Sequence, residues 1–270
     1  MTPTTDKEIS IRSVTTIAEM KVVEDLQREV WVVPDIEIVP FSHMIAAVTA
    51  GGVLLGAFDS EKMVGFAYGF VGYENSQMTH HSHMLAVKPE YRNYKLGERL
   101  KRAQREFVLR QGISLMSWTF DPLQSLNAYF NFNKLGVISD TYFVDFYGDD
   151  APSFLHRNST DRLWVTWNLK DQRTEAGVDL EKVKRLVRLV TGEIPVTFGL
   201  DQNERQLAIE IPTSINRLQE ANLELAVSWR QATRRAFLSA FDYGYTATGF
   251  YRMNRDGQDY GVYLLSRKAQ

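Results

Sequence analysis

The sequence contains no cysteine, and this absence excludes several kinds of chemistry at once. Disulfide bonds, thiolate-bound metals, iron–sulfur clusters and a cysteine nucleophile all require that residue. The sequence also has little excess of either charge. The 31 Lys and Arg residues stand against 33 Asp and Glu residues, so the net charge is −2. No overall positive field is left to attract nucleic acid, and we expect no nucleic-acid partner.

Long apolar runs are also missing. No stretch approaches the roughly 18 consecutive apolar residues that would cross a membrane as a helix. Residues 1–10 are polar and do not form the apolar core of a signal peptide. We therefore expect a cytoplasmic chain that does not bind a membrane. Its 270 residues, 44% of them hydrophobic, suffice for one large domain or two smaller ones with a packed core.

Periodicity in the first part of the chain predicts a mixed sheet with helices on both faces. Thr16 and Glu19 form a capping-box pair that begins a helix. Asp121 stands before Pro122 in the position of a helix N-cap. The expected order is a strand at 8–14, helices at 16–31 and 42–50, strands at 53–58, 63–71 and 80–88, a helix between Pro89 and Gly112, a strand at 113–120, a helix at 121–134, and strands at 137–147 and 163–169.

The rest of the chain predicts a second, smaller unit. We place a compact domain at residues 1–170 and a C-terminal α+β extension of unknown role at 171–270. The pattern helix, glycine, strand, strand from Trp229 to Arg267 echoes the stretch from Asn127 to Leu169, through either a degenerate duplication or coincidence. The extension should hold a helix at 180–190 within a charged segment, a strand at 206–211, one or two helices within 214–243, and a hairpin of 247–253 with 260–265.

One block, residues 81–100, joins an expected strand, a tight turn and a helix. Unpaired N–H groups and the positive end of the helix dipole gather at a helix N-terminus, so such a turn can hold a phosphate or pyrophosphate. Seven basic and two acidic residues lie between Arg92 and Arg110. On charge alone, a solvated helix face is the more common explanation of such a stretch.

The segment from Val87 to Arg92, followed by Gly97, resembles the acetyl-coenzyme A signature of the GNAT N-acetyltransferase superfamily. The resemblance spans residues 8–170 and implies an α/β (α+β) fold with a GNAT-like mixed central sheet flanked by helices. Lys95 stands where the family has its first glycine. A lysine there requires either a negative φ or an outward side chain, and it could contact a phosphate itself. The resemblance implies acetyl-CoA as a co-substrate held by Leu85, Ala86, Val87, Arg92, Asn93, Tyr94, Lys95, Leu96, Gly97 and Glu98.

Two histidines precede this signature on the same expected strand. His81 and His83, followed by a Leu-Ala-Val run, are similar to the arylalkylamine N-acetyltransferase branch of the family, and the resemblance implies that they supply the base. Residues two apart on a strand share a face, so both imidazoles can face one cleft. An ammonium with a pKa near 10 must lose a proton before its nitrogen attacks a thioester, and imidazole titrates near pH 6.5. A purely structural pair is the alternative.

The resemblance further implies a tyrosine acid on the helix after the fifth strand. The family's tyrosine position is Phe132 in this sequence. We expect Tyr129, three residues earlier on the same helical face, or else water, to protonate the departing thiolate. A packed, interfacial ring is the other interpretation of Tyr129. Asn127 and Asn131 are expected to contact the pantetheine arm.

Together these residues predict an acetyl-CoA-dependent N-acetyltransferase that moves an acetyl group to a primary amine by direct attack. The acceptor is a small-molecule amine or a protein amine, and a homodimer through the hairpin edge of the tail is left open. Aromatic residues near the expected strands either line an apolar acceptor pocket or belong to the core. They are Trp31, Phe41, Tyr68, Phe70 and Tyr73.

Two alternatives to this enzyme remain at the level of sequence. The first is a module that binds coenzyme A or a metabolite without turnover, because Lys95 and Phe132 depart from the family pattern. The second is a metal centre on His80, His81, His83 and the distant His43. His80 should point away from its neighbours and no third ligand can be named, so we expect no metal.

Overall fold

The computed structural model describes residues 8–74, 76–148, 158–171 and 177–267. Contacts within the chain divide it into two compact units. Unit 1 holds residues 1–118 and 168–170, and unit 2 holds residues 119–167 and 171–270.

Unit 1 is a sheet with strand order β1-β2-β3-β4-β5, antiparallel except where β4 runs parallel to β5. The strands and helices predicted from periodicity are confirmed here, with small shifts at their ends. They are β1 (Ile9–Ser13), α1 (Ile17–Trp31), α2 (Phe41–Thr49), β2 (Val53–Asp59), β3 (Lys62–Glu74), β4 (Gln77–Val87), α3 (Leu96–Arg110) and β5 (Leu115–Phe120), with short 3₁₀ turns at Asp35–Glu37 and Pro89–Tyr94.

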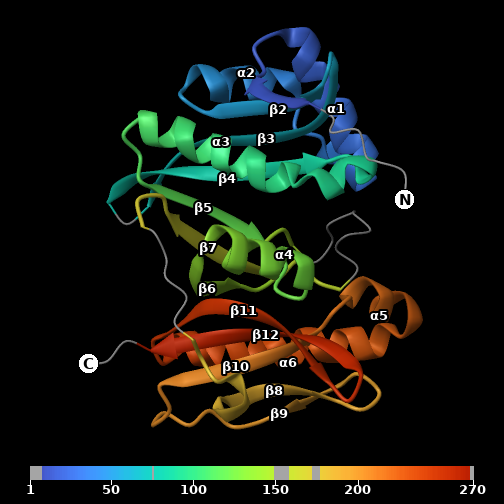
Figure 1. The fold of residues 1–270 in the computed structure, drawn as a ribbon, viewed down its shortest axis with the longest axis vertical. Coiled ribbons are helices and arrows are strands. Elements are labelled where there is room, and N and C mark those ends of the chain that lie inside the picture. The colour runs from blue at the N-terminus through green and yellow to red at the C-terminus, as the bar shows by residue number, and fades with distance from the viewer. Residues whose placement is uncertain (1–7, 75, 149–157, 172–176, 268–270) are drawn as a thin grey trace. The chain divides into compact units, whose positions relative to one another are not determined.

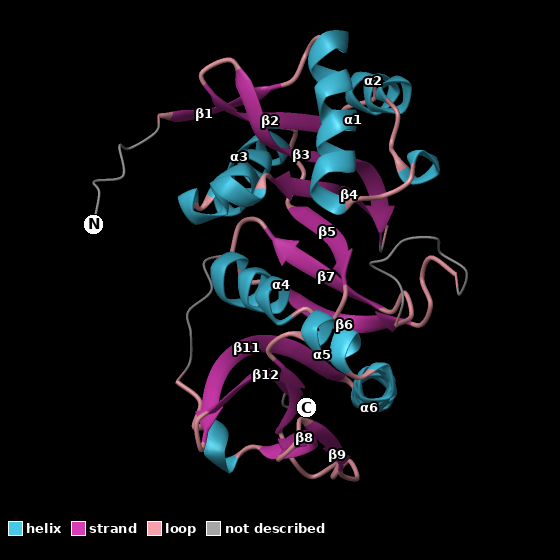
Figure 2. Ribbon diagram, turned by 90° about the vertical axis from the view of Figure 1, so that its right-hand side faces the viewer, coloured by secondary structure: helices cyan, strands magenta, loops and turns pink. Residues whose placement is uncertain are grey.

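Helices cover both faces of this sheet. The capping box at α1 is present: Thr16 accepts a hydrogen bond from the Glu19 N–H, and the Glu19 carboxylate accepts one from the Thr16 N–H. On the α1 and α2 side, Phe66 and Tyr68 are fully buried in one apolar cluster with residues of both helices. Figure 2 shows α3 on the opposite side of β3 and β4 from α1. Burial of these apolar faces holds the first unit together.

Unit 2 contains strands in the order β7-β6-β11-β12-β10-β8-β9 (Figure 1). Neighbouring strands are antiparallel except for β8 and β10, which are parallel. Its elements are α4 (Ser125–Tyr129), a π-helical turn (Phe130–Leu135), β6 (Ile138–Phe143), β7 (Arg162–Asn168), a 3₁₀ turn (Leu180–Lys182), β8 (Lys184–Val190), β9 (Ile194–Thr197), β10 (Gln206–Pro212), α5 (Ile215–Ala221), α6 (Leu223–Asp242), β11 (Tyr245–Arg255) and β12 (Gln258–Arg267).

Two local predictions in this unit are wrong. The helix expected at 180–190 is the strand β8, because pairing with β10 buries Leu186 and Val187 and outweighs helix propensity. Asp121 is not a helix N-cap: its carboxylate accepts from the Leu123 N–H in a turn, and helix α4 begins only at Ser125.

The division of contacts also differs from the predicted boundary at residue 170. Strand β6 pairs with β11 of the tail, through Ser139 and Ala247, so residues 119–167 group with the tail. The hairpin predicted near the C-terminus is present, with a two-residue turn at Asp256 and Gly257, both at positive φ.

The echo between the two helix–hairpin stretches has a structural counterpart. Gly136 and Gly244 each follow a helix in a left-handed conformation, with φ values of 76° and 77°. Each glycine leads into a hairpin, β6 with β7 or β11 with β12. In both hairpins the first strand carries one extra residue, between Ile138 and Thr141 in β6 and between Ala247 and Gly249 in β11. The two stretches therefore share a left-handed glycine after a helix and a bulge in the strand that follows it.

Candidate active site

His81 and His83 lie on one face of β4, as their spacing of two residues predicts, and the strand carries a bulge at His83. Opposite β3, Tyr68 pairs with Met84 whereas Gly69 pairs with Ser82, so His83 is the extra residue on β4. The two imidazole centroids are 6.2 Å apart. Both rings contact Phe70, at centroid distances of 5.4 Å for His81 and 5.7 Å for His83.

A third histidine, His43 of α2, extends this cluster. Its Nδ1 lies 3.0 Å from the Tyr68 hydroxyl, and the Tyr68 ring lies 6.2 Å from that of His83. Burial raises the pKa of Tyr68 to about 12, so its phenol is neutral at physiological pH. Within the described ranges, no three His, Asp or Glu side chains are arranged to hold a metal ion.

The surroundings keep both β4 imidazoles neutral. Burial lowers the pKa of His81 to about 4, and the charges of His83 and Lys101 act in the same direction. Burial and the charge of His43 likewise lower the pKa of His83. The sequence had suggested titration near pH 6.5. A neutral imidazole can accept a proton, which is what a general base must do.

Two polar residues, Glu74 and Ser117, adjoin His81. Ser117 of β5 is fully buried, and its hydroxyl donates to Glu74 Oε1 at 2.5 Å. The Ser117 Oγ also lies 3.4 Å from His81 Nδ1. The Thr79 hydroxyl donates to the same Glu74 oxygen at 3.3 Å. The end of β3, the middle of β4 and the middle of β5 therefore meet at one hydrogen-bonded group.

The opposite face of β4 is polar and closed. His80 is fully buried, and its Nε2 lies 3.1 Å from Gln104 Nε2, while its Nδ1 has no partner. Burial lowers the pKa of His80 to about 3. Lys101 donates to Ser82 Oγ at 2.7 Å, and burial holds the pKa of its amine well below the usual value. As expected, His80 points away from His81 and His83.

The predicted cofactor turn leads directly into α3. Lys95 has φ 54° and ψ 25°, which is the left-handed conformation natural to the glycine it replaces. The first of the two options considered, a negative φ, is therefore wrong, and the exposed side chain points outward. The first bond of α3 runs from the Arg99 N–H to the Lys95 carbonyl. The N–H groups of Leu96, Gly97 and Glu98 come before that bond at the helix N-terminus.

Other predicted cofactor residues surround this turn. Arg92 and Asn93 are exposed, Tyr94 is half-buried with its ring 6.0 Å from that of Tyr91, and Glu98 forms an ion pair with Arg102 at 2.8 Å. The last part of β4, with Leu85, Ala86 and Val87, pairs with β3. The recorded pairs with β5 are His80 with Met116 and His81 with Ser117, although both strands continue.

The remaining predicted site residues belong to unit 2. Tyr129 is half-buried at the end of α4, and the Arg252 guanidinium lies 4.3 Å above its ring. Phe132, where the family's tyrosine would stand, is buried between Phe120 and Tyr263 at centroid distances of 6.4 and 5.7 Å. Asn131 is buried, whereas Asn127 is exposed. Tyr129 and Phe132 thus have different neighbours, despite their spacing.

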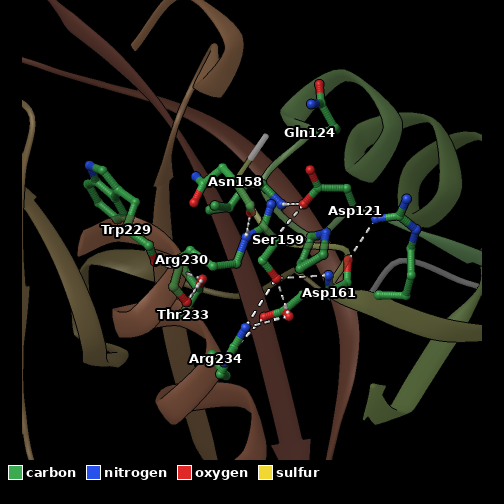
Figure 3. Close-up of polar contacts among 12 residues, drawn as sticks. Asp121, Gln124, Asn158, Ser159, Asp161, Trp229, Arg230, Thr233 and Arg234 are labelled. Carbon is green, nitrogen blue, oxygen red and sulfur yellow. Dashed lines mark hydrogen bonds and ion pairs between the residues drawn. The ribbon is translucent and has the colours of Figure 1, made fainter. Parts of the chain in front are cut away.

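Unit 2 also holds a buried ionic network (Figure 3). Asp121 pairs with Arg230 at 2.7 Å, and Arg234 pairs with the fully buried Asp161 at 2.7 Å. Burial acts to raise the pKa of Asp121, but the charge and hydrogen bond of Arg230 outweigh it and lower that pKa. The network joins α6 to Asp121, in the turn before α4, and to Asp161, the residue that precedes β7.

Sequence reasoning missed Glu74 and Ser117. A serine inside the apolar run Leu115-Met116-Ser117-Trp118 is a signal, because a buried hydroxyl needs a partner. The partner itself depends on which strand lies next to β5, and the sequence does not contain that information directly.

Residues 20–136 match the model of the acetyltransferase (GNAT) family. The matched segment includes the stretch from Val87 to Gly97 on which the resemblance to this family rests. No curated protein matches the sequence. In the described part of the chain, no helix is long and apolar enough to span a membrane.

Several solved structures are similar to the chain at low sequence identity. The ribosomal-protein-S18-alanine N-acetyltransferase of Escherichia coli has 12% identity and a TM-score of 0.48, with 63% of this chain and 99% of that chain covered. The aminoglycoside 6′-N-acetyltransferase of Enterococcus faecium has 15% identity and a TM-score of 0.47, covering 61% and 99%. Arabidopsis thaliana Naa50, in complex with a bisubstrate analogue, has 16% identity and a TM-score of 0.46, covering 58% and 97%.

Proposed function

We propose that the protein is an N-acetyltransferase that moves the acetyl group of acetyl-CoA to a primary amine by direct attack. The observation that carries this proposal is the neutral pair His81 and His83 on β4, placed where the recorded pairing of β4 with β5 ends. The family match over residues 20–136 supports acetyl-CoA as the donor. The domain at 1–170 would carry the reaction, and 171–270 would be an extension.

The chain's own groups would divide the work as follows. The N–H groups of Leu96, Gly97 and Glu98, with Lys95 and Arg92 beside them, would hold the pyrophosphate of the donor. The backbone of β4 from Leu85 to Val87 would bind the pantetheine arm, with Asn127 and Asn131 as further proposed contacts.

His81 Nε2 would accept the proton of the acceptor amine, directly or through water, with His83 beside it. As the new C–N bond forms, the C–S bond breaks and coenzyme A leaves as a thiolate. That thiolate takes its proton from Tyr129 or from water. A backbone N–H near Leu85 would polarise the thioester carbonyl.

The acceptor would be a small-molecule amine or a protein amine, in a cytoplasmic protein that forms monomers or homodimers. Phe70, half-buried between the two imidazoles, and the exposed Tyr73 would face such an acceptor. Tyr68 is fully buried, so this aromatic residue belongs to the core and does not line an acceptor pocket.

A second candidate, binding without turnover, is favoured by one observation. The position where the family has its acidic tyrosine is Phe132, which has no hydroxyl and is buried against Tyr263. The test begins with calorimetric titration of acetyl-CoA into the full chain, followed by an assay for free thiol with a panel of amines. Binding with thiol release supports the enzyme, binding without release for any amine supports the second candidate, and absence of binding contradicts both.

A further inference from the structure

The protons available to His81, Ser117 and Glu74 decide which of these groups donates and which accepts in their hydrogen bonds. The oxygens of Ser117 and Glu74 lie 2.5 Å apart, and two oxygens approach so closely only with a hydrogen between them. Glu74 Oε1 accepts this hydrogen bond and a second one from the Thr79 hydroxyl. The single hydroxyl proton of Ser117 is therefore committed to Glu74.

Ser117 can then only accept from His81. A neutral imidazole carries its proton on one ring nitrogen, and the nitrogen facing Ser117 is Nδ1, at 3.4 Å. With the serine proton already used, the favourable state places the imidazole proton on Nδ1. The lone pair then lies on Nε2, on the side of the ring away from Ser117.

We propose that Glu74 and Ser117 are positioning residues that hold His81 in the tautomer whose Nε2 accepts the proton of the acceptor amine. The role rests on the proposed function, since it concerns the same base. When Nε2 gains the proton, Nδ1 keeps its own, and the carboxylate of Glu74 lies one hydroxyl away from the new positive charge. No proton needs to leave the group for this stabilisation.

Burial sets this arrangement apart from a surface contact. Ser117 is fully buried, and within the described residues the charged or titratable groups near His81 include Glu74 on β3, His83 on the same strand and Lys101 on α3, with His43 of α2 near His83. Glu74 is the acid of this set.

The first test measures the tautomer and needs no activity. Full-length protein labelled with ¹⁵N at its five histidines is studied by long-range ¹H–¹⁵N correlation NMR, with the His81 signals assigned by their loss in His81→Gln. We expect protonated Nδ1 in the wild type and a shift to protonated Nε2 in Ser117→Ala. Protonated Nε2 in the wild type, or an unchanged tautomer in Ser117→Ala, overturns the proposal.

Two further variants separate hydrogen bonding from charge. Glu74→Gln keeps an oxygen that accepts from Ser117, so the Nδ1–H tautomer should remain, while the nearby negative charge is lost. Ser117→Thr keeps the hydroxyl and should restore the wild-type tautomer, which excludes a packing effect of the alanine variant. Ser82→Ala is the matched control, because Ser82 is a buried serine on the opposite face of β4, bonded to Gln104 and Lys101.

The second test is kinetic. With acetyl-CoA and an accepted amine, kcat should fall about tenfold to a hundredfold in Ser117→Ala and in Glu74→Gln, the loss typical of one hydrogen bond to a charged group. The KM for acetyl-CoA should stay within about twofold, and Ser82→Ala should retain kcat. A wild-type kcat in both Ser117→Ala and Glu74→Gln contradicts the positioning role.

The outcomes of the two tests distinguish a failure of the proposed function from a failure of this inference. If no amine is acetylated but the tautomer changes as expected, the proposed function is wrong and the hydrogen-bonded group is still established. If acetylation is found but the tautomer does not depend on Ser117, the function stands and this inference is wrong.

Discussion

Ser139 and Ala247 pair with each other where β6 meets β11, and each lies three residues beyond a left-handed glycine, Gly136 or Gly244. Equivalent positions of two similar hairpins therefore meet as partners in an antiparallel ladder. Such a self-pairing is the geometry of a local two-fold axis. Farther along, Tyr142 and Phe250 stand at matching distances from their glycines, and both are buried.

The two units differ in the segment that connects their parallel strands. Strands β4 and β5 are parallel and are joined through α3, whereas the parallel strands β8 and β10 are joined through β9. Within the fully described stretch 177–267, no helix lies between β8 and β10. The connection from β8 to β10 therefore offers no helix N-terminus of the kind that α3 offers between β4 and β5.

We therefore predict one acetyl-CoA site per chain. Calorimetric titration should give a stoichiometry of about one, since only the first half combines parallel strands with a turn into a helix. Two equivalent sites per chain would show that the second half also binds the donor, contrary to this argument.

Replacement of His81 tests the base. His81→Gln should lower kcat by about a hundredfold or more, as expected for the loss of a general base, with little change in the Kd for acetyl-CoA. Because the pKa of His81 is about 4, the wild-type base is neutral at neutral pH and becomes protonated only as the pH falls through about 4. The pH profile of kcat should therefore stay level from pH 7 to about 5 if His81 alone controls it. A wild-type rate in His81→Gln across this range would remove His81 from the mechanism.

Lys95→Gly tests the departure from the family signature. Lys95 already has the glycine-like backbone conformation, so the substitution removes only the side chain and its charge. Acetyl-CoA binding should weaken about twofold to fivefold at low salt, and the difference should shrink as salt screens the charge. Stability should not fall, because a left-handed lysine is strained and glycine is not. Tighter binding in Lys95→Gly would show that the lysine obstructs the donor.

Lys101→Met tests the buried amine behind β4. The folded-state pKa of Lys101 lies below its unfolded value of about 10.5, so the unfolded chain binds the proton more tightly. The free energy of unfolding should rise with pH as the pH approaches the unfolded pKa of about 10.5, by at most about 1.4 kcal/mol per pH unit from this group. Urea unfolding of Lys101→Met should lose that slope, whereas the exposed control Lys62→Met should keep it. Equal slopes in the wild type and Lys101→Met would contradict a lowered pKa of the buried amine.

Arg230→Met tests the ionic network of unit 2. The substitution leaves the carboxylate of Asp121 without its main cation, and the free energy of unfolding should fall by about 3 to 5 kcal/mol. Asp121→Asn combined with Arg230→Met should cost less than Arg230→Met alone, since no unpaired charge is then left. Equal losses in the single and the double variant, measured by urea unfolding, would indicate packing instead of electrostatics.

The sequence determined the elements with strong local signals. Thr16 and Glu19 mark the start of α1 because a capping box needs only residues three positions apart in the chain. The strand, turn and helix around Arg92 and Gly97 were predictable for the same reason, and so was the family that residues 20–136 match. Alternation on β4 also indicated which of its histidines share a face.

Tertiary structure alone decided the features that depend on neighbours distant in sequence. Segment 184–190 became a strand because β10 offered a partner, and Asp121 lies in a turn before α4, where it pairs with Arg230. Glu74 and Ser117 reach His81 only because β3, β4 and β5 are adjacent in the sheet. Local periodicity cannot specify such contacts, since their energies arise when the sheet assembles and buries their polar groups together.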